Sequence, residues 1–128
     1  MNQRLASAEI PRPEPDLSPE AMIDRARRLK DVIRAEAPHA EKRGHYGSDL
    51  HEQFLKAGFY RILQPRRFGG YEFDVPTFFK VMVEISAADP GIGWGLCLGS
   101  GHALQIGSYF SESRRRRYLA MTDILSHP

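Results

Sequence analysis

The chain has 128 residues, of which 41% are hydrophobic and 27% charged, as in one globular domain. Its 18 basic and 16 acidic residues nearly cancel, so no strong field selects nucleic acid or a membrane surface as a partner. The single cysteine, Cys97, excludes an internal disulfide, and the N-terminus lacks the apolar core of a signal peptide, so we expect a cytoplasmic protein.

Residues 1–17 are polar and contain three alternating prolines, a pattern typical of a flexible, extended arm. The first helix is predicted to begin at Ser18, because serine is a good N-cap and a proline and an acidic residue follow it. Apolar residues then recur at helical spacing as far as Ala37. Acidic residues are interleaved with the basic ones, so we interpret the polar face as solvated.

The middle of the chain is divided by glycines. A Ser-Asp pair at 48–49 is predicted to cap a second helix that Gly58 ends. A short extended run is expected over residues 59–64, followed by a turn at the glycine pair 69–70.

Three more helices are predicted in the second half. Asp74 caps the first, Pro90 begins the second, and the third covers residues 111–120. Strand-like alternation is minor throughout, so residues 18–120 are predicted to form an all-α domain.

The helix that begins at Pro90 is unusual because it contains six glycines between positions 91 and 110. Each glycine costs about 1 kcal/mol relative to alanine inside a helix, so their presence needs a reason. We interpret them as a flat stripe on a buried helix, against which another backbone or a planar ligand can lie. Its members recur every four residues: Gly91, Gly95, Gly99, Ala103 and Gly107.

Other interpretations of this helix fit less well. A membrane span is disfavoured because Ser100, His102 and Gln105 dilute its apolar character. A nucleotide loop is disfavoured because the third glycine of the dinucleotide motif is missing and no strand precedes it. The histidines of the chain lack metal-ligand spacing, so no metal site is expected.

His102 is the candidate catalytic residue of this helix. At about 100° per residue it lies roughly 20° from Gly95, so its imidazole projects from the edge of the stripe. Trp94 lies about 80° away and can border the same cavity. The alternative is that both side chains belong to the core.

Two blocks carry a resemblance to a known family. "LKAGFYRILQPRRFGGYEFD" followed by "EISAADPGIGW" resembles the N-terminal helical domain of the acyl-CoA dehydrogenase superfamily. The tryptophan and the "GSGH" at 99–102 resemble its flavin-dependent hydroxylase branch. In this family a β-domain and a C-terminal four-helix bundle follow, so the resemblance implies a chain truncated before both, with residues 121–128 as the start of the β-domain.

The resemblance also implies a function. It implies the oxygenase component of a two-component monooxygenase, a homotetramer that hydroxylates a small aromatic substrate with O2 and reduced flavin. The flavin, FMN or FAD, would come from a separate flavin reductase. His102 would face the substrate hydroxyl or the flavin edge, and an imidazole there could stabilise a phenolate. The implied pocket residues are Trp94, Gly95, Leu98, Gly99 and Ser126.

Two other functions stay open. One is an acyl-CoA dehydrogenase, which oxidises an acyl thioester with FAD, and the other is a non-catalytic helical interaction module. Most flavin contacts of the family, and the glutamate base of its dehydrogenases, have no counterpart in the 128 residues. We therefore expect the chain alone to be inactive.

Overall fold

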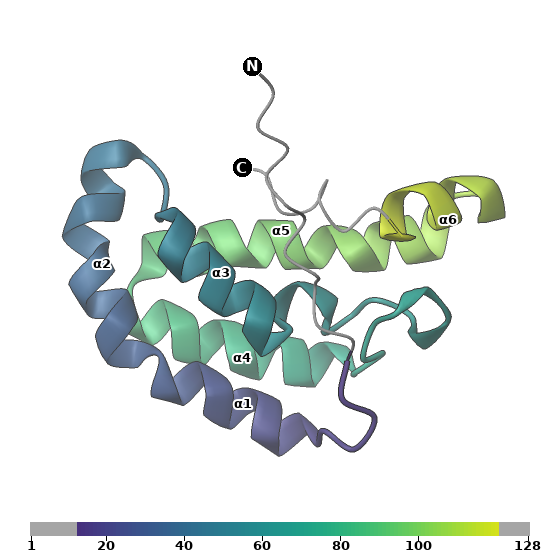
Figure 1. Cartoon of the computed structure of the whole chain (residues 1–128), viewed down its shortest axis with the longest axis horizontal. Coiled ribbons are helices and arrows are strands. Elements are labelled where there is room, and N and C mark those ends of the chain that lie inside the picture. Colours follow the sequence, from purple (N-terminus) through teal and green to yellow (C-terminus); the bar gives the residue numbers. More distant parts are fainter. Residues whose placement is uncertain (1–12, 121–128) are drawn as a thin grey trace.

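The computed structural model describes residues 13–120, and every regular element in that range is helical, as predicted. The expected start of a β-domain at 121–128, with Ser126, lies outside the described residues. Figure 1 shows the arrangement of the helices. They are α1 (Pro19–Arg28), α2 (Lys30–Arg43), α3 (Ser48–Ala57), α4 (Val75–Ala88), α5 (Pro90–Tyr109) and α6 (Glu112–Ala120), with two 3₁₀ turns, η1 (Phe59–Arg61) and η2 (Arg66–Phe68).

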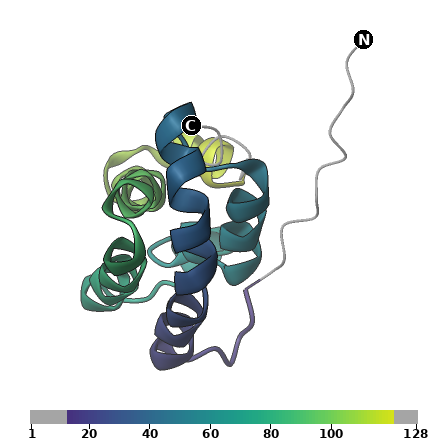
Figure 2. The ribbon, with the colours of Figure 1, turned by 90° about the vertical axis from the view of Figure 1, so that its left-hand side faces the viewer.

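The first predicted helix is in fact two helices, so the expectation of one continuous helix from Ser18 to Ala37 was wrong. The break falls at Leu29, whose N–H donates to the Ala26 carbonyl at 3.2 Å, an i to i−3 bond that tightens the turn. This bend lets α1 pack on α4 while α2 contacts both α4 and α5. In Figure 2, α4 and α5 lie on one side of α2 and α3 lies on the other.

Two predicted N-caps, Ser18 and Asp74, are confirmed, and Asp89, which was not predicted, caps α5 in the same way. In each of them a side-chain oxygen accepts a hydrogen bond from the backbone N–H three residues further on, which satisfies one of the free donors of the first turn. The pairs are Ser18 with Ala21 (3.1 Å), Asp74 with Thr77 (2.9 Å) and Asp89 with Ile92 (2.8 Å).

The start of α3 differs from the prediction. Ser48 is already the first helical residue, the N-cap is Gly47, and no side chain caps the helix. The Gly47 N–H instead donates to a carboxylate oxygen of Glu36 in α2, at 2.9 Å. A contact between two helices therefore replaces the local cap that the sequence suggested.

The extended run predicted over residues 59–64 is also wrong, because this segment begins with the η1 turn. Gly58 ends α3 as predicted, with a φ of +82°. Phe59 and Ile62 are then completely buried, and the chain turns so that neighbouring side chains can all enter the core. An extended run would send alternate side chains to solvent.

The glycine pair 69–70 forms the predicted turn, and the two glycines are needed for different reasons. Gly69 has a φ of +83°, where side chains are strained. A Cβ on Gly70 would lie 1.9 Å from the backbone oxygen of Gln64. Gln64 is itself buried, and its amide nitrogen donates to the Phe68 carbonyl at 2.5 Å and to the Leu119 carbonyl at 3.3 Å. One buried amide thus joins this loop to α6.

Candidate functional site

Helix α5 has a packed face and an exposed face. Ile92 and Leu96 are buried, at 2% and 0% exposure, and lie on the packed side. Trp94 and Leu98 are 67% and 46% exposed, and His102 is exposed as well. The expectation of a buried helix therefore holds for only one side of α5, and within residues 13–120 neither Trp94 nor His102 lies in the core.

The structure brings three of the predicted site residues together. Trp94, Leu98 and His102 follow one another at intervals of four residues, so they lie along one side of α5. Gly101 adds open space beside them, because a Cβ there would meet no atom within 4 Å. Among the described residues His102 has no hydrogen-bond or ion-pair partner. The result is a smooth apolar surface with one available imidazole.

Gly95 borders this surface, since it is exposed and lies roughly 20° from His102 around the helix. A Cβ on Gly95 would be 3.3 Å from Cε1 of Tyr46, so this position faces the segment between α2 and α3. Residues four apart drift by about 40° around a helix, so the series from Gly91 to Gly107 turns through roughly 160°. The predicted flat stripe, with Gly99 at its middle, is therefore a spiral and does not form a single face.

The closest backbone approach of α5 occurs at Gly93 instead. A Cβ on Gly93 would lie 2.0 Å from Oγ and 2.9 Å from Cα of Ser86 in α4. Gly93 therefore sets the distance between the two helices. The sequence reasoning missed it because it does not belong to the four-residue series. The available signal was the pairing of two small residues on consecutive helices.

Tyr46, which lies next to Gly95, belongs to a hydrogen-bonded group of three aromatic side chains. The Tyr60 hydroxyl is 2.6 Å from the Tyr46 hydroxyl and 2.9 Å from Nδ1 of His51. Burial raises the pKa of Tyr60 and of Tyr46, so both phenols stay neutral. This hydrogen-bonded group fixes the Tyr46 ring against α5. Its members come from three separate segments, so sequence spacing could not reveal it.

No cluster of His, Cys, Asp and Glu side chains within residues 13–120 is placed to hold a metal ion. None of the helices in this range, α5 included, has both the length and the apolar character that crossing a bilayer requires.

Comparison with known proteins identifies the family. The model of the family described as acyl-CoA dehydrogenase, N-terminal domain, matches residues 19–122. The chain therefore belongs to this family, as the resemblance indicated. No solved structure gives a significant match.

Curated relatives give a more specific likeness. An indole-3-acetate monooxygenase of Acinetobacter baumannii is 32% identical over 92 residues, which cover 72% of this chain and 23% of the relative. The oxygenase component of a p-hydroxyphenylacetate 3-hydroxylase of Acinetobacter baumannii is 25% identical, over 85% of this chain and 26% of that protein. A dibenzothiophene monooxygenase of Rhodococcus erythropolis is 35% identical, over 65% and 19%. The matched region thus spans about a quarter or less of each relative.

Proposed function

We propose that this chain is the N-terminal domain of a flavin-dependent monooxygenase, the oxygenase component of a two-component system. Residues 18–120 form the helical domain in this proposal, 1–17 an arm, and 121–128 lead into a β-domain. The observation that carries it is the exposed surface of Trp94, Leu98 and His102, an apolar wall with one imidazole. The names of the relatives support the reaction class.

The surface fits one wall of a flavin site. The isoalloxazine ring is planar and largely apolar, and α5 offers an apolar surface with no charged side chain and open space at Gly101. Bound reduced flavin, FMN or FAD from a reductase, would supply the chemistry that transfers oxygen from O2 to a small aromatic substrate. Other parts of the protein or of a homotetramer would complete the enclosure.

Each side chain has a role in this proposal. Trp94 and Leu98 exclude water, which protects a reactive intermediate. His102 hydrogen-bonds the substrate hydroxyl and stabilises the phenolate, as a neighbouring general acid or base does. Gly95 and Gly99 keep the adjoining surface narrow, and Ser126 supplies a hydrogen-bond donor near the flavin or substrate.

The test is replacement of His102 by alanine in a longer protein that contains this domain. If the imidazole stabilises charge, we expect the rate of hydroxylation to fall by about 10²-fold, or the amount of hydrogen peroxide released per product to rise by a similar factor. His39→Ala is the matched control, because His39 is an exposed histidine on α2. Equal coupling and rate in both variants would remove His102 from the site.

The description of the family supports a second candidate, an acyl-CoA dehydrogenase. The two functions differ in where the electrons come from. In a dehydrogenase, an acyl-CoA thioester reduces the oxidised flavin directly and bleaches its absorption, with no reductase present. A monooxygenase needs reduced flavin and O2 to form product. A longer protein that binds no flavin and does neither would support the third alternative, a non-catalytic interaction module.

A further inference from the structure

A cavity lies between the segment before α1 and the loop around η2, and no residue of α5 lines it. Its volume is about 550 Å³, within the range of small-molecule sites. Its lining includes the apolar residues Pro13, Pro15, Leu17 and Phe73. The Tyr71 and Phe73 rings are stacked, with centroids 5.3 Å apart, and form a rigid aromatic wall.

The polar end of this cavity is formed by arginine. Arg61 is half-buried, and its Nη1 donates to the Gly69 carbonyl at 2.9 Å. Its Nε is buried and has no hydrogen-bond partner among residues 13–120. A buried donor without an acceptor is costly, so the fold is more stable when an acceptor is supplied. Burial lowers the pKa of Arg61, and no carboxylate among the described residues counteracts this shift.

Among the described residues that line the cavity, the one carboxylate is Glu14, and it is already engaged. Glu14 accepts from Nη2 of Arg25 at 2.7 Å and from the Tyr71 hydroxyl. Arg25 also donates to the Ala57 carbonyl at 3.0 Å, which fixes the pair to the end of α3. The charge of Glu14 is therefore balanced by Arg25 and leaves Arg61 uncompensated.

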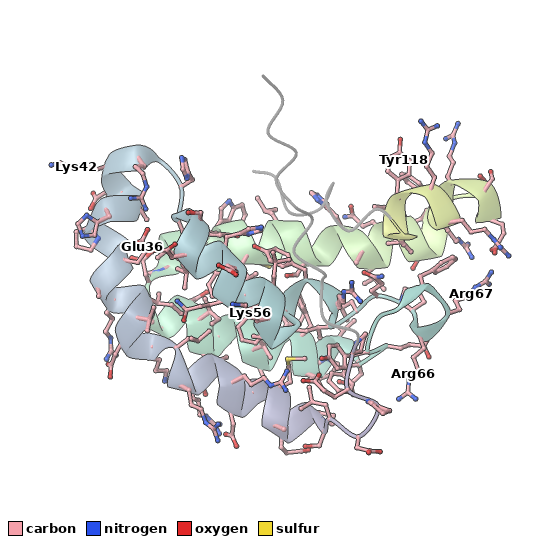
Figure 3. The ribbon with its side chains drawn as sticks, viewed as in Figure 1. Glu36, Lys42, Lys56, Arg66, Arg67 and Tyr118 are labelled. Atoms are coloured by element: carbon pink, nitrogen blue, oxygen red, sulfur yellow. The ribbon has the colours of Figure 1, made fainter. Side chains whose placement is uncertain are left out.

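A second cation lies at the rim. Arg66 lines the cavity, and Figure 3 shows Arg66 and Arg67 leaving η2 in different directions. Arg67 is paired with Glu112 of α6. Arg66 forms no ion pair among the described residues. Two guanidinium groups without a carboxylate partner, those of Arg61 and Arg66, therefore line the same cavity. The lining of the cavity thus combines two guanidinium groups with proline and aromatic side chains.

We propose that this cavity binds a small carboxylate with an apolar body, whose oxygens accept from the Arg61 guanidinium while its hydrocarbon part lies between the prolines and Phe73. A carboxylate suits a guanidinium because two parallel N–H donors match its two oxygens. The apolar walls contribute affinity that a bare anion does not obtain. The site is independent of the function proposed for α5.

The probe is benzoate, with benzamide as its uncharged counterpart. Titration of the ¹⁵N-labelled chain at constant ionic strength should shift the Nε–Hε signal of Arg61 with benzoate and not with benzamide. Acetate, which lacks the apolar body, should bind about tenfold more weakly. Equal responses to benzoate and benzamide, or phosphate binding as tightly as benzoate, would overturn the proposal.

Substitutions give a second readout, the dissociation constant from calorimetry. Arg61→Gln should weaken benzoate binding by about 10- to 100-fold, because a charge-assisted hydrogen bond is lost. The matched control is Arg34→Gln, an exposed arginine of α2 that should change the affinity by no more than about twofold. If Arg61→Gln does not fold, Arg61→Lys is the second variant. It retains the positive charge but not the two parallel N–H donors, so it should still bind benzoate more weakly than the unchanged chain. Unchanged affinity in both Arg61 variants would also overturn the proposal.

Discussion

Gly93 and Gly101 lie on the same helix, and the structure predicts opposite results when each is changed to alanine. An alanine at Gly93 would place its Cβ 2.0 Å from Oγ and 2.9 Å from Cα of Ser86. Rotating the Ser86 side chain removes the first clash, but the second requires α4 and α5 to move apart. An alanine at Gly101 meets nothing within 4 Å.

The magnitudes follow from two competing terms. Alanine is favoured over glycine inside a helix by about 1 kcal/mol, and this gain applies at both positions. Overpacking a tight contact costs about 1–3 kcal/mol, which at Gly93 outweighs the gain. We expect Gly93→Ala to lower the free energy of unfolding by up to about 2 kcal/mol and Gly101→Ala to raise it by up to about 1 kcal/mol.

Urea unfolding of the chain, followed by circular dichroism, measures both variants on one scale. The sign of the difference between them is the decisive quantity, because the substitution and the helix are the same. The double variant Gly93→Ala with Ser86→Gly should recover only part of the loss, since the Ser86 backbone remains in place. Equal stabilisation by alanine at Gly93 and Gly101 would show that the two helices are not held at this distance.

Two further predictions concern the glycine loop and the segment before α1. Gly70→Ala should lower the free energy of unfolding by about 3 kcal/mol or more, because the new Cβ would lie 1.9 Å from the Gln64 backbone oxygen. The amides of the Gln64 loop should also exchange their hydrogens faster, and a loss of stability below about 1 kcal/mol would contradict the prediction. The hydrogen bonds from Arg25 and Tyr71 hold the pKa of Glu14 at about 2, so its contribution is complete above the ordinary value of 4.5 and lost as the pH falls through 2. Glu14→Gln should therefore destabilise the chain by about 1 kcal/mol or less near pH 6 and not near pH 2, as urea unfolding at both pH values would show; an equal effect at both would contradict the assignment.

The sequence predicted the features that depend on neighbouring residues. The caps at Ser18 and Asp74 were found because a side-chain oxygen satisfies an N–H three residues away, which needs no tertiary contact. The break at Leu29 was not found, because apolar spacing continues through it and only packing on α4 bends the chain. The buried Gln64 was missed for a related reason: one of its acceptors, the Leu119 carbonyl, is 55 residues away.

The candidate site divides in the same way. Helical periodicity placed Trp94 about 80° from His102, the resemblance added Leu98, and all three are exposed in the structure. Periodicity could not show which side of the helix the core would cover. That depends on Gly93, whose missing side chain lets α4 approach from the opposite direction.

The glycines of α5 therefore have different causes. Packing within the domain explains Gly93, because any larger residue would push α4 away. The same argument fails for Gly101, which forgoes about 1 kcal/mol of helix propensity while no atom of the described chain uses the space. The neighbouring Trp94 keeps 67% of its surface exposed, although burying a large aromatic side chain is strongly favourable. Both features gain a physical reason if a planar ligand or another part of a longer protein lies against this face.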